Sequence, residues 1–116
     1  MTQEDYVSFE TAKLLKEKGF SELTTKAYPY FENKNYKYDI SCPTLQMAMK
    51  WLRKSHNLYI ESYVIKNYNN KKMEYTYSIQ DLDFNGSDDG IECCKNWNSP
   101  EEACEAAIKY CLEKLI

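Results

Sequence analysis

One acidic stretch of the chain has the residue types and the spacing of a calcium-binding loop. Residues 81–92 read DLDFNGSDDGIE, which matches the pattern D-x-[DN]-x-[DN]-G-x5-E at every specified position. Calcium takes about six to eight oxygen ligands from a short backbone that turns sharply at a glycine, here Gly86. The ligand oxygens of such a site would come from Asp81, Asp83, Asn85, Ser87, Asp89 and Glu92.

The surroundings of this loop favour a different interpretation. Calcium loops of this kind lie between two helices, whereas residues 73–79 alternate in polarity as a strand does. Loop position 8 normally holds an apolar residue that pairs with a second loop, but here it is Asp88 and the chain has no second loop. We therefore expect an acidic connector between strands that turns at Gly86 and Gly90. Calcium is the alternative, and the sequence indicates no other cofactor.

A second candidate site is the basic, tyrosine-rich stretch 26–72. It carries nine basic residues against three acidic ones, a net charge of +6, whereas residues 73–116 carry three lysines against ten acids, a net charge of −7. Lysines can follow a phosphate backbone and tyrosine rings can stack on bases, so this stretch is a candidate nucleic-acid surface. Its candidate contacts are Lys34, Tyr36, Lys37, Tyr38, Lys66, Lys71 and Lys72.

The remaining reactive side chains give little support for catalysis. His56 is the single histidine, and no spacing pairs it with a cysteine nucleophile. The three glycines of the chain form no phosphate-binding loop. The cysteines contain no C-x-x-C pair and are interpreted as buried apolar residues, with a zinc site of the last four as the alternative; they are Cys42, Cys93, Cys94, Cys104 and Cys111. We expect a protein that is not an enzyme.

Two helices are predicted in the first half of the chain. One covers residues 9–18, with Ser8 as its N-cap and Gly19 as the residue that ends it. The second begins with Pro43 in its first turn, where the missing N–H costs nothing, and it stops at Asn57.

The final helix has the strongest start signal in the chain. Ser99 is the expected N-cap, Pro100 the first helical residue and Glu102 the partner in a capping box. Glu105 and Lys109 are expected to form a supporting pair on the solvent side. The apolar stripe recurs at helical spacing through Cys104, Ala107, Ile108, Cys111, Leu112 and Leu115.

The other segments read as strands. Residues 27–40 are predicted to form an irregular tyrosine-rich hairpin around Asn33-Lys34-Asn35. Strands are expected over 58–66, 73–79 and 91–97. From Pro43 onward the order is therefore α-β-β-β-α, with two helices on one face of an antiparallel sheet. We expect one α+β domain over residues 1–116, in which residues 1–42 form a helix and hairpin extension of the 43–116 core.

The element order of residues 43–116 resembles the double-stranded RNA-binding domain, and the tail SPEEACEAAIKYCLEKLI resembles the last helix of that family. That family places a basic cluster at the start of this helix, where the present chain has Glu101, Glu102 and Glu105. The likeness therefore concerns architecture and argues against RNA binding.

A closer resemblance is to small uncharacterised proteins of gut bacteria and of their phages and mobile elements. It rests on the segments SFETAKLLKEKGF, PTLQMAMKWLRKSHNLYI and SPEEACEAAIKYCLEKLI. The resemblance implies an accessory protein that acts by binding.

The sequence also bears on location and partners. The N-terminus MTQEDYVSFE is not a secretory signal, and no apolar run approaches the roughly 18 residues of a membrane helix, so we expect a cytoplasmic protein. We expect an interaction protein with a protein partner, which includes a second copy of the chain. Nucleic acid is the less favoured partner, and a calcium-stabilised domain is the third hypothesis for the function.

Overall fold

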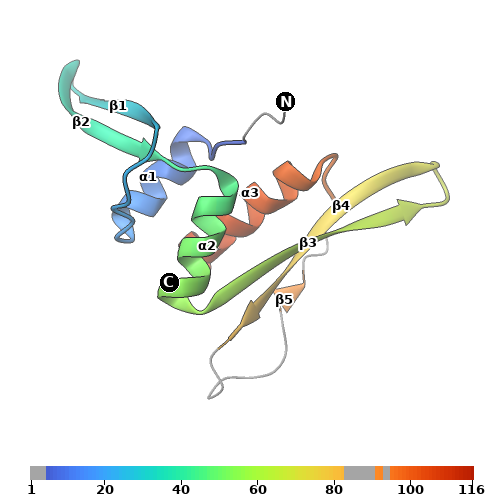
Figure 1. The fold of residues 1–116 in the computed structure, drawn as a ribbon. Coiled ribbons are helices and arrows are strands. Elements are labelled where there is room, and N and C mark those ends of the chain that lie inside the picture. The colour runs from blue at the N-terminus through green and yellow to red at the C-terminus, as the bar shows by residue number, and fades with distance from the viewer. Residues whose placement is uncertain (1–4, 83–90, 93–94) are drawn as a thin grey trace.

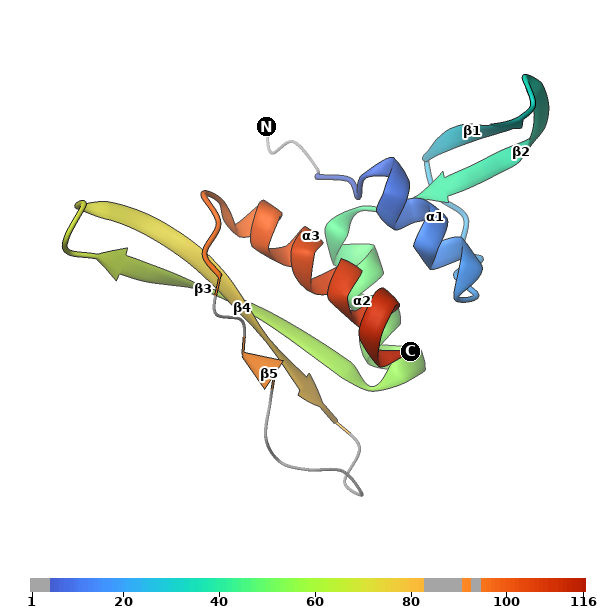
Figure 2. The ribbon, with the colours of Figure 1, turned by 180° about the vertical axis from the view of Figure 1, so that it is seen from behind.

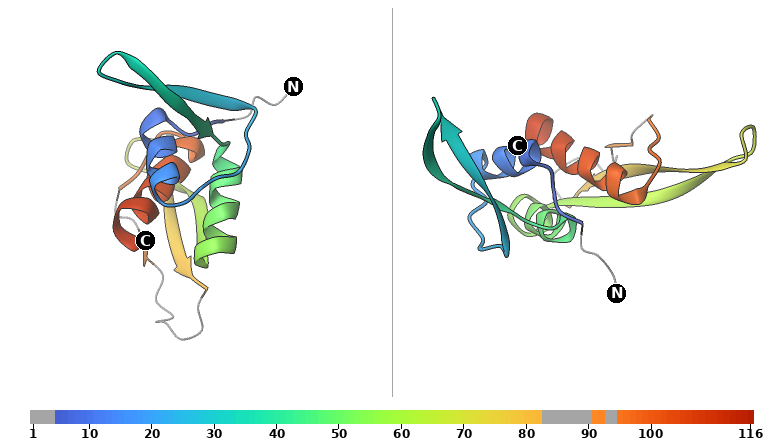
Figure 3. Two further views of the ribbon diagram at one scale, coloured as in Figure 1. Left: turned by 90° about the vertical axis from the view of Figure 1, so that its left-hand side faces the viewer. Right: turned by 90° about the horizontal axis from the view of Figure 1, so that it is seen from above.

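The computed structural model describes residues 5–82, 91–92 and 95–116, and it shows an α+β fold (Figure 1). The described α-helices α2 and α3 lie side by side, between the long β3–β4 hairpin on one side and α1 with the β1–β2 hairpin on the other (Figure 3). The predicted fold class and the α-β-β-β-α order are confirmed. In chain order the elements are α1 (Phe9–Glu17), β1 (Lys26–Glu32), β2 (Asn35–Cys42), α2 (Leu45–His56), β3 (Leu58–Asn67), β4 (Lys72–Asp81), β5 (Ile91–Glu92), α3 (Pro100–Tyr110) and the π-helical turn η1 (Cys111–Leu115).

Helix α1 begins where its sequence predicts and ends at Glu17, one residue before the predicted end. The Ser8 hydroxyl accepts the N–H of the third helical residue at 3.3 Å, which satisfies one of the free donors of the first turn. Gly19 follows the helix with a φ of +102°, a conformation that only glycine adopts without strain. The Phe20 N–H then bonds to the Leu15 carbonyl at 2.9 Å, and the Phe20 side chain is buried.

The β1–β2 hairpin is more regular than its sequence suggests. Its turn consists of Asn33 and Lys34, whose φ values of +51° and +66° match the twist of a two-residue hairpin turn. Glu32 pairs with Asn35 across this turn, and the strands pair antiparallel over their whole length except for a register shift after Tyr30. The predicted hairpin is therefore confirmed, with Asn35 inside β2 and not in the turn.

Helix α2 begins at Leu45, two residues later than expected. Its N-cap is Thr44, whose hydroxyl accepts the N–H of Met47 at 3.1 Å, so Pro43 precedes the cap and lies outside the first turn. The Pro43 carbonyl instead accepts the Val7 N–H at 3.1 Å, which fastens the chain before α1 beside the start of α2. The helix ends at Asn57, which adopts the left-handed conformation with a φ of +56°, as predicted.

The second sheet has the strand order β3-β4-β5, and all its pairings are antiparallel. β3 and β4 form a long hairpin of which α2 and α3 cover only the half nearest the helices (Figure 2). In that half Ile60, Tyr77 and Ile79 are buried. Toward the hairpin tip the same face is exposed, with Val64 at 47% and Met73 at 52%. The predicted apolar face of β4 is correct, but the helices are too short to cover all of it.

The third strand differs from the prediction. The expected strand over residues 91–97 consists of the two-residue β5 and an isolated bridge between Tyr75 and Trp97, and residues 93 and 94 lie outside the described part of the chain. Trp97 is held there by two backbone hydrogen bonds to Tyr75, at 2.7 and 2.9 Å, and its ring lies 5.4 Å from that of Tyr77. Local alternation of apolar residues did not distinguish these short pieces from one strand.

Helix α3 starts at the predicted cap but ends differently. The Ser99 hydroxyl accepts the Glu102 N–H at 3.2 Å, and the Glu102 carboxylate accepts the N–H of Asn98 where a capping box would use that of Ser99. The last turn is the π-helical η1, since the Ile116 N–H bonds to the Cys111 carbonyl five residues earlier. The predicted helix over these residues is thus continuous but widens in its final turn.

One cluster of buried apolar side chains joins the first 42 residues to the rest of the chain. Helix α1 contributes Ala12 and Leu15, the segments on either side of it contribute Val7 and Phe20, and β2 contributes Ile40 and Cys42; the remaining members come from α2, the second sheet, α3 and η1. Because both parts of the chain bury their apolar faces in the same cluster, the β1–β2 hairpin is fixed to the core by the end of β2 as well as by its contact with α1.

The Leu112→Ala substitution tests this core. Leu112 is fully buried, so we expect a loss of ~2–5 kcal/mol in the free energy of unfolding, through lost burial and the cavity left behind. Urea denaturation followed by circular dichroism measures it, with the exposed neighbour Glu113→Ala as the control. A loss below about half a kcal/mol, the size of an ordinary surface effect, would place Leu112 outside the core.

Candidate functional site

The acidic loop joins two strands, as its sequence indicates. Asp81 is the exposed last residue of β4, and Glu92 lies in β5, where it pairs with Ser78 of β4. The loop therefore connects two antiparallel neighbours and not two helices. Calcium binding stays a prediction, since the other proposed ligands lie outside the described residues: Asp83, Asn85, Ser87 and Asp89.

We expect calcium to leave the stability of the protein unchanged. A ligand that binds only the folded state raises the melting temperature, and strands flank this loop where helices would be needed to fix a calcium site. The measurement is a melting curve of chelator-treated protein with and without millimolar calcium, with magnesium as the control. A rise in the melting temperature with calcium alone would contradict this interpretation.

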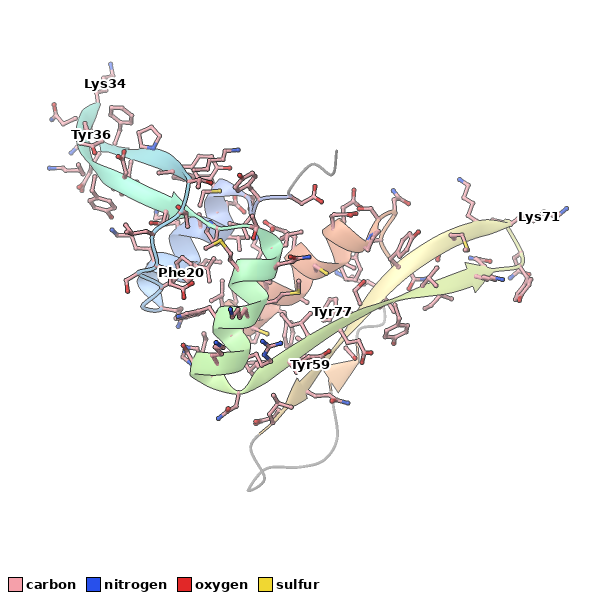
Figure 4. All side chains as sticks on the ribbon, viewed as in Figure 1. Phe20, Lys34, Tyr36, Tyr59, Lys71 and Tyr77 are labelled. Atoms are coloured by element: carbon pink, nitrogen blue, oxygen red, sulfur yellow. The ribbon has the colours of Figure 1, made fainter. Side chains whose placement is uncertain are left out.

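The structure divides the predicted nucleic-acid contacts between two hairpins. The β1–β2 hairpin carries four of them, including Lys34 and Tyr36, and the β3–β4 hairpin carries three, including Lys71. Figure 4 shows these labelled residues at opposite ends of the molecule, whose longest dimension is 51 Å. Three further basic residues of the stretch lie on α2, so its net charge of +6 is spread over three places: Lys26, Lys34 and Lys37; Lys50, Arg53 and Lys54; Lys66, Lys71 and Lys72.

The β1–β2 hairpin carries an ordered group of aromatic rings. Tyr30 and Tyr38 are cross-strand partners, and their rings are stacked at 5.1 Å with an interplanar angle of 25°. Phe31 and Tyr36 pair nearer the tip, edge to face at 6.0 Å, and both are more than half exposed, at 56% and 57%. Cross-strand aromatic pairs stabilise a two-stranded sheet that has little other support.

Two lysines of α1 complete this surface. The Lys13 ammonium lies 5.3 Å from the centre of the Tyr30 ring, and the Lys16 ammonium lies 3.9 Å from that of Tyr38. Both distances are within the range of cation–π attraction. Sequence reasoning missed these lysines because they precede the basic stretch, although their i, i+3 spacing places them on one side of the predicted helix. We use the name hairpin face for the exposed Phe31–Tyr36 pair together with the neighbouring Tyr30–Tyr38 stack and its lysines Lys13 and Lys16.

A carboxylate on α3 anchors the start of α1. Glu105 Oε1 accepts the Ser8 N–H and the Thr11 hydroxyl, each at 2.8 Å, while Glu105 Oε2 is buried without a hydrogen-bond partner. Lys109 pairs with Glu10 of α1 at 2.9 Å. The expected pair of Glu105 and Lys109 on the solvent side is therefore wrong, because both side chains reach across to α1. A negative charge at the N-terminus of α1 also complements the helix dipole.

The ion pair between Glu10 and Lys109 shifts the pKa values of both residues. Hydrogen bonding and attraction to the Lys109 ammonium lower the pKa of Glu10, and the Glu10 carboxylate raises the pKa of Lys109 in return. Both side chains are solvent-exposed, so water and salt screen their attraction. The partly buried hydrogen bond between Thr11 and Glu105 is screened less, so it contributes more to the α1–α3 contact than this ion pair does.

The described cysteines are neutral thiols. Burial raises the pKa of Cys42 and of Cys104, and it raises the pKa of Cys111 to about 12. A thiol acts as a nucleophile or a metal ligand as the thiolate, which these environments disfavour. Cys93 and Cys94 of the alternative zinc site lie outside the described residues, and within those residues no group of three or more His, Cys, Asp or Glu side chains could hold a metal.

A shallow groove of about 680 Å³ lies beside the α1–α3 contact. Its lining carries both signs of charge, with the lysines Lys26 and Lys109 and the carboxylates Asp5, Glu101, Glu102 and Glu105. The Lys26 ammonium already lies 4.9 Å from the centre of the Tyr6 ring. The Lys109 ammonium is paired with Glu10, and no group of the described carboxylates could hold a metal, so the groove favours no single ionic ligand.

Comparison with known proteins adds no relative. No protein-family model matches the chain, and neither the curated proteins nor the solved structures contain a significant match. Among the described helices, none is long and apolar enough to cross a membrane. The resemblance to small proteins of gut bacteria and their mobile elements stays a prediction.

The Glu105→Ala substitution tests the α1–α3 anchor. It removes the acceptor of the Ser8 N–H and the Thr11 hydroxyl, so we expect a loss of about 1–2 kcal/mol in the free energy of unfolding. Urea denaturation measures it, and Glu101→Ala is the control because Glu101 is an exposed acid of the same helix. Equal effects of the two substitutions would show that the Glu105 contacts contribute nothing.

Proposed function

We propose that this chain is a non-enzymatic interaction protein that binds another protein through the hairpin face. The observation that carries the proposal is the exposed aromatic group at the end of the β1–β2 hairpin, which projects away from the core (Figure 4). Exposed Phe31 and Tyr36 rings contribute nothing to the hydrophobic core. Aromatic side chains are enriched in the buried centres of protein–protein interfaces, where they contribute much of the binding energy.

The arrangement of the face also indicates the chemistry of its partner. The Phe31 and Tyr36 rings offer an apolar centre, and Lys13 and Lys16 lie beside the Tyr30–Tyr38 stack behind it. A matching surface would be apolar at its centre and would carry carboxylates at its rim. The stacked tyrosines and the lysines over them hold the hairpin rigid, which reduces the entropy lost on binding.

The charge of this region favours a protein over a nucleic acid. Helix α1 and the hairpin together hold five lysines against four carboxylates, a net charge of only +1. Nucleic-acid affinity depends on several lysines that each neutralise a phosphate. In addition, Tyr30 and Tyr38 already lie against each other and against lysines, so bases would have to displace these contacts in order to stack.

Nucleic acid remains the second candidate because Lys13 and Lys16 join the predicted contacts Lys34 and Lys37 on one side of the molecule. Fluorescence anisotropy with a labelled single-stranded oligonucleotide at low salt separates the two functions. We expect no binding. A rise in anisotropy that disappears as salt is added would support nucleic acid and contradict our proposal.

The proposal is tested by replacing Phe31 and Tyr36 together with serine. We expect this variant to lose a protein that the wild type retains in a pull-down from the organism that encodes it, because both exposed rings are removed. The matched control replaces Tyr68 and Met73, two exposed residues of the other hairpin. Equal retention by both variants, in nuclease-treated lysate and with unchanged circular dichroism, would overturn the hairpin face as the binding surface.

A further inference from the structure

The strand β3 forms an open edge of the second sheet. The strand order is β3-β4-β5, so β4 occupies one side of β3, and no other described strand pairs with its outer side. β3 is ten residues long and pairs with β4 without a bulge. The backbone N–H and C=O groups along such an edge are a ready template for another strand.

This edge carries few of the features by which proteins usually block strand pairing, since its charged residues are only Glu61 and Lys66. It contains no proline and no bulge, and the helices cover only its first half, where Leu58 and Ile60 are buried. Beyond that half three consecutive apolar residues are exposed: Tyr63, Val64 and Ile65. Both faces of the strand are therefore apolar and uncovered at the same place.

The order of these residues is self-complementary. A two-fold axis perpendicular to the sheet through Val64 pairs β3 antiparallel with itself and keeps corresponding faces aligned. Val64 then lies opposite the partner's Val64 on one face, and Tyr63 lies opposite the partner's Ile65 on the other. Pairs of β-branched and aromatic residues are favourable across strands. The two charged residues of this segment oppose neutral ones, since Glu61 meets the partner's Asn67 and Lys66 meets the partner's Ser62.

Helix α2 stands at one end of this pairing. It borders the first residues of β3, where Met49 and Arg53 share a hollow with Tyr59 and Ile60. In the register centred on Val64, residues 61–67 of the two copies overlap, beyond the part of β3 that α2 borders. The hairpin tip of each copy, the end marked by Lys71 in Figure 4, then lies beside the start of the other copy's β3 and the end of its α2.

We propose that two copies of this chain associate through antiparallel pairing of β3 with β3, centred on Val64, which joins their sheets into one. This surface is separate from the hairpin face at the other end of the molecule. An overlap of this length is small for a protein–protein interface, so the dimer forms reversibly and depends on concentration.

The test compares Val64→Lys with Met73→Lys by sedimentation velocity over a range of concentrations. Val64 and Met73 lie on the same face with similar exposure, but Met73 belongs to β4 and lies off the edge. We expect a reversible dimer for the wild type and for Met73→Lys. Val64→Lys places two ammonium groups opposite each other at the axis, so it should remain a monomer at every concentration.

Three results would overturn the proposal: a wild type that stays monomeric, a Val64→Lys variant that dimerises like the wild type, or a dimer lost equally in Met73→Lys. Loss of the dimer on replacing Phe31 and Tyr36 would also contradict it, because that change leaves β3 intact. If the hairpin face binds no protein, the β3 dimer is still expected, so the two proposals fail independently.

Discussion

The contact of Glu105 with the start of α1 determines how the two parts of the chain fit together. One carboxylate oxygen accepts hydrogen bonds from the Ser8 backbone and the Thr11 hydroxyl, across 97 and 94 residues of sequence. The Ser8 N–H is one of the donors at a helix start that lack partners within the helix itself, and the Thr11 donor is a side-chain hydroxyl of the first turn. The second oxygen is buried without a partner, which costs free energy. Burial of apolar side chains such as Ala12 and Leu15 in the shared cluster offsets this cost.

Helix α1 thereby connects the core to the β1–β2 hairpin. Its buried side contributes to the common cluster, and its exposed side presents Lys13 and Lys16 to the stacked tyrosines. A two-stranded hairpin is marginally stable alone in water, so its shape depends on such support. The β3–β4 hairpin is supported at its base only, because α2 and α3 cover half of it and its tip extends beyond the core. The molecule thus exposes two strand surfaces, one at the end of the β1–β2 hairpin and one on the uncovered half of the β3–β4 hairpin.

Local signals predicted most of the elements. Side-chain caps such as Ser8 and Ser99, the glycine after α1 and the Asn33–Lys34 turn act within a few residues, so they can be recognised from sequence spacing. The start of α2 was predicted at Pro43, but Thr44 after it is the better N-cap, so the helix begins beyond the proline. The third strand was overextended because pairing with β4 decides its length, and alternation does not report pairing.

The candidate surfaces depend on contacts distant in sequence and were therefore only partly predictable. Tyr36 and Tyr38 were chosen for their residue type, which the exposed hairpin supports, but their lysine neighbours come from another element. The basic stretch looked like one site because charge was summed along the chain, whereas folding sends its three groups to different elements. Glu105 was assigned to the solvent side because its helical position does not reveal which helix packs beside it.

Amide hydrogen exchange of the free protein tests the central claim most directly, since it reports whether α1 is held to the core. The reporters are the amides of Ala12 and Leu15 in α1 and of Ile108 in α3, all of which are buried residues. If the Glu105 contact and the shared cluster fasten α1, these amides should exchange through the same opening of the structure and show similar protection. Exchange of Ala12 and Leu15 near the rate of an unstructured peptide, with Ile108 still protected, would contradict the account.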